Sequence, residues 1–412
     1  MNLNEKFLNF LRWSEKYAQT DMVYVVKGGF WILLGKIGIL LLAFIKMVIW
    51  GRFLPKEVYG VYVYIIAVID ILVIFSLPGI NTSLIKAIAQ KKEGTLNLAI
   101  KEKLKFSLIG SLIALFLFFY YLFNQKYTLA YAFLGGAVFF PFANSFPIYL
   151  SFWVGRKRFD VQNKYEFISA SLIVLFSVPV IFFTNNVVFI VLALFVSQAV
   201  FNGLFLGKTL KNQLNNEVSP EIIPFGKSLT IINSISLFAN QIDKIIIWQI
   251  LGPTSVAVYS FAQLPVVKIF GIIPISPLAL PKLVERNVKE IKEGIIKKVK
   301  KLFFVVVPFV FLIFFFAPWV YKIIFPQYLD SVPYFRVLSL SLLFIPFSLF
   351  SASLVTERKK KELYIIENIV PLLKIILFIV LIPLYGIWGM VFAAMISIIL
   401  YNILRLYYFK KI

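Results

Sequence analysis

The chain has 412 residues, of which 60% are hydrophobic, and it carries a net charge of +23. Water cannot be the solvent for most of such a sequence, which excludes an ordinary soluble domain. The sequence contains neither cysteine nor histidine. This absence excludes disulfides, thiolate and imidazole chemistry, and any haem or zinc site built from these two side chains.

The sequence predicts an all-α polytopic membrane protein. A bilayer core of about 30 Å needs about 20 apolar residues per helix, and the apolar runs do not alternate as barrel strands do. Twelve transmembrane helices are predicted, in two six-helix bundles related by a pseudo-two-fold axis along the membrane normal. The predicted spans are 28–50, 59–80, 104–123, 128–150, 164–183, 187–207, 226–250, 255–279, 302–323, 332–355, 363–383 and 385–408.

Four regions follow from these spans. Residues 1–27 mix Phe7, Phe10 and Trp13 with charged residues, and this segment is expected to lie on the cytoplasmic membrane interface. Residues 28–207 form the N-terminal six-helix bundle, 208–225 a cytoplasmic linker, and 226–412 the C-terminal six-helix bundle.

The basic charge indicates membrane topology. Most of the 42 Lys and Arg fall in the tails and even-numbered loops, as the positive-inside rule requires if both termini are cytoplasmic. The predicted location is therefore the cell (inner) membrane, crossed many times. Membrane lipids are expected partners through their anionic headgroups, whereas nucleic acid is not expected. The clearest basic clusters are Arg156 to Arg158, Lys297 to Lys301 and Arg358 to Lys361.

A repeat at an offset of 198 residues, close to half of the chain, is the best single indication of function. A duplicated, two-lobed transporter leaves such a pattern. Trp50, Pro55 and Val58 recur at Trp248, Pro253 and Val256. The same offset places Lys46 onto Lys244 and Asp70 onto Lys268, all within apolar stretches.

Seven ionisable residues fall well inside predicted spans, where one charge costs from about 2.5 to over 10 kcal/mol. They are Lys36, Lys46, Asp70, Asp243, Lys244, Lys268 and Lys374. Two interpretations remain open. Pairing, such as Lys46 with Asp70 or Asp243 with Lys268, together with snorkelling of the outer lysines, explains part of the set. A water-filled cavity lined by several lysines explains the excess of positive charge.

The seventh predicted span adds a polar stripe. At 100° per residue, two adjoining arcs of the helix are polar, so half of its surface is not expected to face lipid. Polar contacts between helices and the wall of a cavity are the two explanations, and the number of groups favours the wall. The arcs hold Thr230, Ser234, Gln241 and Lys244, and Asn233, Ser236, Asn240 and Asp243. A lysine-lined cavity would suit an anionic substrate such as a phosphate or diphosphate.

Several stretches resemble polysaccharide flippases of the Wzx type, within the multidrug/oligosaccharidyl-lipid/polysaccharide exporter superfamily. The matching residues are Leu54, Pro55, Tyr59 and Gly60; Gly79, Ile80 and Ser83; Gln241 to Lys244; Leu251 to Pro253; Val258 to Ser260; Ala262 and Gln263; Pro281 to Leu283; and Ile382 to Gly389. The resemblance implies a V-shaped pair of six-helix bundles around a central cavity. It also implies export of lipid-linked oligosaccharide.

The predicted function is a flippase that moves polyprenyl-diphosphate-linked oligosaccharide from the inner to the outer leaflet by alternating access. No catalytic residue, cofactor or metal is expected, and a coupling ion is left open. No GxxxxGK[ST] sequence is present, so an ATP-driven step would need a partner. Polysaccharide polymerase or ligase machinery is a further candidate partner. The expected substrate-binding residues are Lys36, Lys46, Lys244, Lys268, Gln241 and Lys374, with Asp70 and Asp243 for coupling or charge pairing.

Two other functions fit the sequence less well. A cation-coupled multidrug exporter of the same superfamily would need a net-acidic cavity for cationic drugs, and the lysine excess argues against it. A polytopic glycosyltransferase or polymerase would need acidic groups on sizeable outward loops. The predicted outward loops are only a few residues long, so an enzyme is not expected.

Overall fold

The computed structural model describes residues 22–272, 288–356 and 360–411, which are nearly all helical and contain no strand. Ten of the helices there are long and apolar enough to cross a membrane, which makes the chain a multi-pass membrane protein. These ten coincide with ten of the predicted spans. The predicted spans 28–50 and 255–279 fall on α2 (Met22–Phe53) and α13 (Pro253–Ile272), with 273–279 outside the described residues. The all-α fold class is confirmed. The count of twelve and the two-fold axis stay predictions.

The helices form two compact units. Unit 1 comprises residues 1–47, 72–184 and 188–230, and unit 2 comprises residues 48–71, 185–187 and 231–412. The helix pair around Trp50 and Pro55 thus belongs with the C-terminal part of the chain. The predicted domain boundaries stay predictions, and residues 1–21 of the predicted interfacial segment lie outside the described residues.

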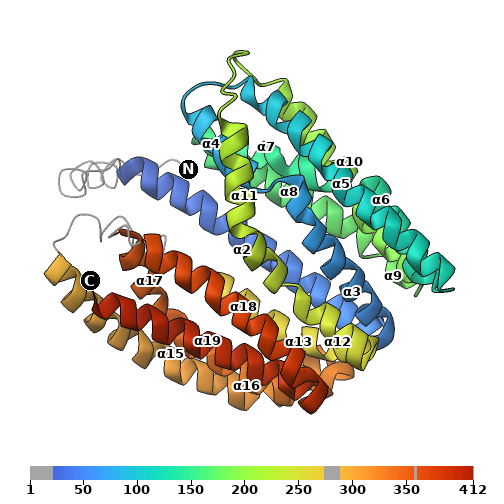
Figure 1. Cartoon of the computed structure of the whole chain (residues 1–412), viewed down its shortest axis with the longest axis vertical. Coiled ribbons are helices and arrows are strands. Elements are labelled where there is room, and N and C mark those ends of the chain that lie inside the picture. Colours follow the sequence, from blue (N-terminus) through green and yellow to red (C-terminus); the bar gives the residue numbers. More distant parts are fainter. Residues whose placement is uncertain (1–21, 273–287, 357–359, 412) are drawn as a thin grey trace. The chain divides into compact units, whose positions relative to one another are not determined.

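Unit 1 contains a helical hairpin. Its two helices, α5 and α6, are joined by a short turn and pack side by side (Figure 1). Small residues at their contact allow the close approach; a Cβ on Gly110 would lie 2.4 Å from the ring of Phe140. The elements are η1 (Val73–Ser76), α4 (Gly79–Ala89), α5 (Thr95–Phe123), α6 (Tyr127–Ser145), η2 (Phe146–Ile148), α7 (Tyr149–Gly155), α8 (Phe159–Ser177), α9 (Val180–Phe183) and α10 (Val187–Leu210), with parts of α2 and α11 (Ile222–Ala239).

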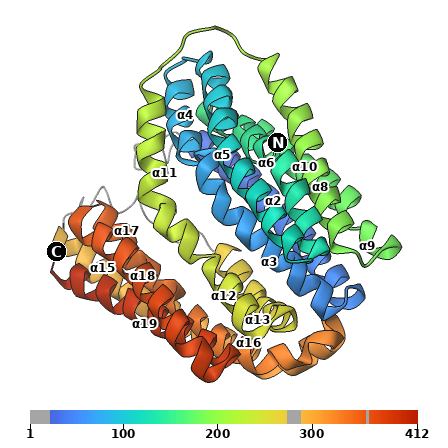
Figure 2. The same ribbon diagram turned by 45° about the vertical axis from the view of Figure 1, so that its right-hand side comes forward.

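Unit 2 packs its last two helices side by side, as Figure 2 shows for α18 and α19. Its core is aromatic: the ring of Phe261 stacks on Tyr328 at 3.6 Å and contacts Tyr59 at 4.9 Å. The elements are α3 (Lys56–Leu72), α12 (Ile242–Leu251), α13, α15 (Val288–Ile324), η3 (Pro326–Ser331), α16 (Val332–Ser339), η4 (Leu340–Phe347), α17 (Ser348–Thr356), α18 (Lys360–Tyr385) and α19 (Ile387–Lys410).

The two copies of the sequence repeat lie against each other within unit 2. A Cβ on Gly60 would lie 1.9 Å from the carbonyl oxygen of Pro253, so α3 and the start of α13 touch where only glycine fits. Both repeated tryptophans pack on α3. Trp50 meets Tyr62 edge to face at 4.4 Å, and Trp248 stacks on Tyr64 at 4.4 Å. The repeat therefore marks a packed interface between helical hairpins.

The predicted linker is fixed to unit 1 by one buried carboxylate. Glu93, in the turn before α5, accepts hydrogen bonds from Arg156 at 2.7 and 2.5 Å and from the backbone N–H of Leu214 at 2.7 Å. Arg156 also donates to the carbonyl of Asn212 at 2.6 Å. Next to it, a Cβ on Gly94 would lie 2.5 Å from the backbone of Asn216. The segment after α10 is thereby held against the α4–α5 turn.

Replacement of Glu93 by Ala should destabilise unit 1. The change leaves the guanidinium of Arg156, whose side chain is 16% exposed, without its carboxylate. Loss of one partner from a buried ion pair costs about 3–5 kcal/mol. Thermal unfolding of the purified protein in detergent measures the effect. Glu217→Ala, which alters an exposed carboxylate on the same segment, is the control and should leave the unfolding temperature unchanged. Equal stability of Glu93→Ala and the wild type would contradict the role given to Glu93.

The same contact should make stability depend on pH in the acid range. Burial alone raises the pKa of Glu93, but the hydrogen bonds from Arg156 and Leu214 outweigh it and hold the pKa below its usual value. A carboxyl with a lowered pKa stabilises the folded state above its unfolded pKa of about 4.3, and the contribution is lost as pH falls through the folded value. The stability difference between wild type and Glu93→Gln should therefore be constant from pH 6 to 8. It should shrink below about pH 4. If the stability difference between wild type and Glu93→Gln instead changes near pH 7, the effect belongs to another titratable group.

Candidate substrate site

The predicted seventh span is interrupted. Helix α11 ends at Ala239, and α12 begins at Ile242 after a turn at Asn240 and Gln241. The Nζ of Lys244 donates to the carbonyl of Asn240 at 3.3 Å, which partly replaces the lost helical bond. Interrupted helices expose backbone groups that membrane transporters use for binding. The single polar stripe predicted for this span is therefore broken into two parts at the turn.

Asp243, in the first turn of α12, is fully buried and surrounded by donors. Its carboxylate accepts from the backbone N–H of Lys244 at 2.9 Å, from the Tyr259 hydroxyl at 3.3 Å and from Gln263 Nε2 at 3.2 Å. Lys244 Nζ completes the ion pair at 3.4 Å. Tyr259 and Gln263 lie one turn apart on α13, so the carboxylate joins α12 to α13. A buried charge is tolerated when it is paired and hydrogen-bonded in this way.

The polar network extends from Asp243 to α3. Gln241 Oε1 accepts from Lys244 Nζ at 2.9 Å, while Gln241 Nε2 donates to the carboxylate of Asp70 at 3.0 Å. The amide side chain therefore bridges the lysine of one helix and the carboxylate of another. Of the residues predicted for the site, the structure brings together Asp70, Gln241, Asp243 and Lys244.

The other predicted lysines of unit 2 lie on neighbouring helices. Lys374 on α18, which packs against α12, interacts electrostatically with Asp243 and Lys244, and its amine lies 5.2 Å from the ring centre of Phe378. Lys268, on α13, has an exposed side chain. Asp243 forms its ion pair with Lys244 rather than with Lys268, which the sequence had left open.

The two predicted lysines of unit 1 both lie on α2. Lys36 has an exposed side chain and interacts electrostatically with Glu166 of α8. Lys46 is half-buried. That these two lysines bind the substrate stays a prediction. The same holds for the other residues that the sequence predicts for the site.

Sequence reasoning missed three members of these networks. Glu166 lies two residues inside the predicted span 164–183 and was not among the seven ionisable residues singled out there. Tyr259 and Gln263 appeared only as parts of the family resemblance. Their spacing of four residues, which places them on one face of a helix, was the signal that could have found them.

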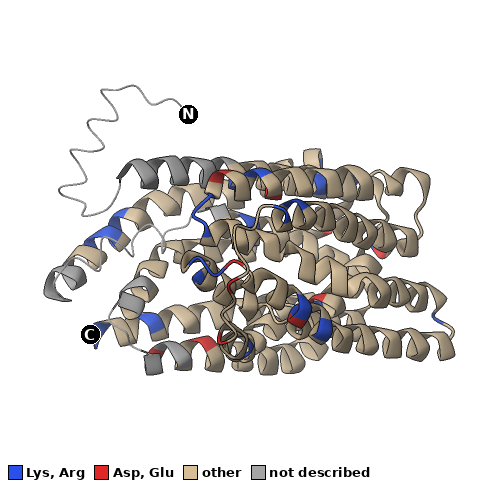
Figure 3. Cartoon of the chain, turned by 90° about the horizontal axis from the view of Figure 1, so that it is seen from above, with Lys and Arg blue, Asp and Glu red and all other residues tan. Residues whose placement is uncertain are grey.

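Charged residues are sparse along the helices (Figure 3), so this group stands out. Around the turn between α11 and α12, two lysines (Lys244 and Lys374) face two carboxylates (Asp70 and Asp243), and Lys268 adds a third positive charge to the same apolar unit. In the described ranges no group of three or more carboxylates could hold a metal ion. The arrangement offers amine and amide donors, which suits an anionic or hydroxyl-rich ligand.

Solved structures share this fold over nearly the whole chain. The lipid II flippase MurJ in an inward closed conformation matches with a TM-score of 0.72 and 15% identity, covering 93% of this chain and 87% of that one. An inward-facing multidrug resistance MATE family transporter of the MOP superfamily matches with a TM-score of 0.61 and 17% identity, covering 92% and 99%. A MOP superfamily transporter from Pyrococcus furiosus matches with a TM-score of 0.59 and 17% identity, covering 93% and 96%. The chain has the fold of MOP superfamily membrane transporters.

A family assignment follows from the sequence itself. The family model described as "Polysaccharide biosynthesis protein" matches residues 25–280, which is more than half of the chain. The chain therefore belongs to this polysaccharide biosynthesis family, and the resemblance seen in the sequence is confirmed. The search of curated proteins found no match to the chain.

Replacement of Asp243 by Asn should weaken unit 2. The amide turns one acceptor into a donor, which then faces either the donors of Tyr259 and Gln263 or those of Lys244. An unsatisfied buried polar group costs about 1–3 kcal/mol. Asp70→Asn is the matched control, because Asp70 is only half-buried and has one hydrogen-bonded partner, Gln241, in this network. Thermal unfolding in detergent should show a larger loss for Asp243→Asn. An equal or smaller loss would show that the carboxylate does not hold α12 against α13.

Proposed function

We propose that the chain is a flippase that moves a polyprenyl-diphosphate-linked oligosaccharide across the cytoplasmic membrane by alternating access. The observation that carries the proposal is the positive excess of unit 2, where Lys244, Lys374 and Lys268 accompany the carboxylates Asp70 and Asp243 in apolar helices. Membership of the polysaccharide biosynthesis family supports the choice of a glycan. The fold shared with a lipid II flippase supports the choice of a lipid-linked one.

The lysines have a physical reason to bind the diphosphate. Within apolar helices a positive charge is weakly screened, so it attracts an anion more strongly than it does in water. Lys268 supplies an exposed amine, and Lys244 holds an amine at the helix break, where it donates to the carbonyl of Asn240. Gln241 adds an amide that can donate to sugar hydroxyls. The polyprenyl tail would stay in the lipid, because burying it in a polar site would be unfavourable.

Neutralisation of the lysines tests the proposal. Lys268→Gln and Lys244→Gln should each slow translocation of a lipid-linked oligosaccharide in reconstituted vesicles by about tenfold or more, since a hydrogen bond to a charged group contributes about 1.5–3 kcal/mol. Lys244→Arg keeps the charge and controls for folding at the helix break. Lys322→Gln, at the exposed end of α15, is the matched control and should transport normally. Undiminished transport in both neutral variants would contradict a cationic substrate site.

A multidrug exporter is the second candidate. It is favoured by the shared fold with a multidrug resistance transporter, and by the buried Asp243 and half-buried Asp70, whose carboxylates could attract organic cations. A strain lacking the gene separates the two candidates. Loss of surface glycan with unchanged drug resistance supports the flippase, whereas loss of resistance with normal glycan supports the exporter.

A further inference from the structure

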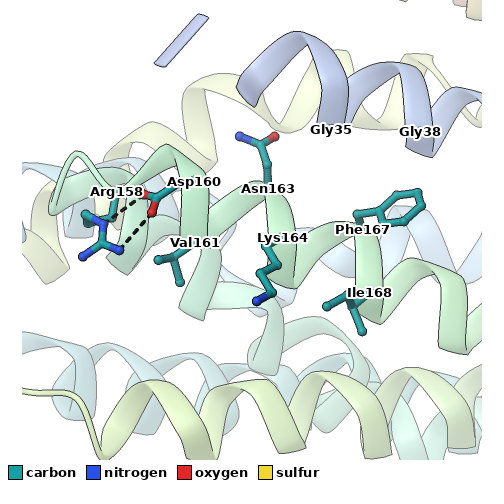
Figure 4. A pocket seen from close by; sticks show the side chains of 9 residues that line it. All are labelled: Gly35, Gly38, Arg158, Asp160, Val161, Asn163, Lys164, Phe167 and Ile168. Carbon is teal, nitrogen blue, oxygen red and sulfur yellow. Dashed lines mark hydrogen bonds and ion pairs between the residues drawn. The ribbon is translucent and has the colours of Figure 1, made fainter. Parts of the chain in front are cut away.

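A cavity in unit 1, apart from the polar network of unit 2, has no role in the proposed transport. It has a volume of about 630 Å³ and lies along α8 where that helix meets α2 (Figure 4). Asn163 and Phe167 point toward α2, whereas Val161, Lys164 and Ile168 point to the other side of α8. The lining of the cavity includes the charged residues Arg158, Asp160 and Lys164 and the apolar residues Val161, Phe167 and Ile168.

Two glycines of α2 shape the cavity. A Cβ on Gly35 would lie 2.4 Å from the Asn163 side chain, and one on Gly38 would lie 2.7 Å from the ring of Phe167. The backbone of α2 thus rests directly on α8 at these positions, without side chains to fill the space beside the contact. Small residues at membrane helix contacts permit this approach. The result is an apolar surface formed by helix backbone and an exposed phenyl ring.

The charges of the cavity leave one positive charge uncompensated. Arg158 donates from Nε and Nη2 to the two carboxylate oxygens of Asp160, at 2.9 Å each. That guanidinium is committed to its carboxylate. Lys164, one turn further along α8, is exposed and forms no ion pair within the described part of the chain. A ligand in the cavity would therefore meet one available amine.

Polar and apolar groups are ordered along α8. The helix starts at Phe159 and rises about 1.5 Å per residue, so Lys164 lies about 8 Å and Ile168 about 14 Å from its start. Arg158 and Asp160 lie at the end of the span, and Phe167 and Ile168 lie toward its middle. This order matches a membrane lipid, whose headgroup stays at the interface while its chains enter the hydrocarbon.

We propose that this cavity binds a glycerophospholipid with a singly charged anionic headgroup, the phosphodiester at Lys164 and one acyl chain along Ile168, which points to the same side of α8. One free amine balances one phosphodiester charge. A diphosphate carries more negative charge than this cavity neutralises, so the lipid-linked substrate fits less well. A zwitterionic headgroup brings its own cation and gains less from Lys164. The proposal concerns a lipid that binds the transporter and is independent of the glycan moved.

Native mass spectrometry of the whole protein tests the site. The protein is taken from nanodiscs of equal phosphatidylglycerol and phosphatidylcholine, and the retained lipid is counted. Lys164→Ala should lower retained phosphatidylglycerol about fivefold, because one basic residue near the membrane surface contributes about 1 kcal/mol. Lys164→Arg should retain it. Lys101→Ala, at a similar depth on α5 and also exposed, should match the wild type. Soluble glycerol 3-phosphate should not compete, because it lacks the acyl chain.

Four results would overturn the proposal. The first is equal retention of phosphatidylglycerol by wild type and Lys164→Ala. The second is an equal loss in Lys101→Ala, which would show general surface attraction. The third is retention of phosphatidylcholine to the same extent as phosphatidylglycerol. The fourth is displacement of the lipid by polyprenyl diphosphate at equimolar concentration, which would assign the cavity to another ligand.

Discussion

The buried carboxylate of Asp243 is the constraint on which the architecture of unit 2 depends. A charge in this environment is stable only if its oxygens are satisfied, and the donors come from two helices: Lys244 on α12, and Tyr259 and Gln263 on α13. The requirement fixes the rotation of α12 against α13. It also fixes the position of the break after α11, because the lysine that pairs with Asp243 donates to the carbonyl freed there.

The repeat and the polar network are parts of one packing arrangement. Gly60 against Pro253, and Tyr64 against Trp248, bring α3 close to the helices that carry the second copy. Asp70 then reaches Gln241, and the network gains its second carboxylate. The duplicated motif therefore supplies the apolar contacts. The positions at which the copies differ, Asp70 and Lys268, supply the charges that give the unit its chemistry.

The two basic sites of the molecule differ in what surrounds the charge. In unit 2 the lysines lie among amides, a phenol and carboxylates, so a ligand there would be recognised by several directional bonds. In unit 1 the amine of Lys164 points to the same side of α8 as the apolar side chains of Val161 and Ile168. The first environment suits a polar, multiply charged group, and the second suits an amphiphile. Membership of a polysaccharide biosynthesis family and the transporter fold are consistent with a protein that contacts both kinds of ligand.

The sequence by itself determined the helical membrane fold, ten of the spans and the family, because apolar run length and local motifs are properties of consecutive residues. It also marked Asp70, Gln241, Asp243 and Lys244, since charged groups in apolar stretches are rare. Only the tertiary structure decided their partners. The choice of Lys244 over Lys268 as the partner of Asp243 depends on how α12 is rotated and on the helix break after Ala239, which no proline marks in the sequence. These are set by contacts between residues far apart in the chain, which hydropathy does not encode.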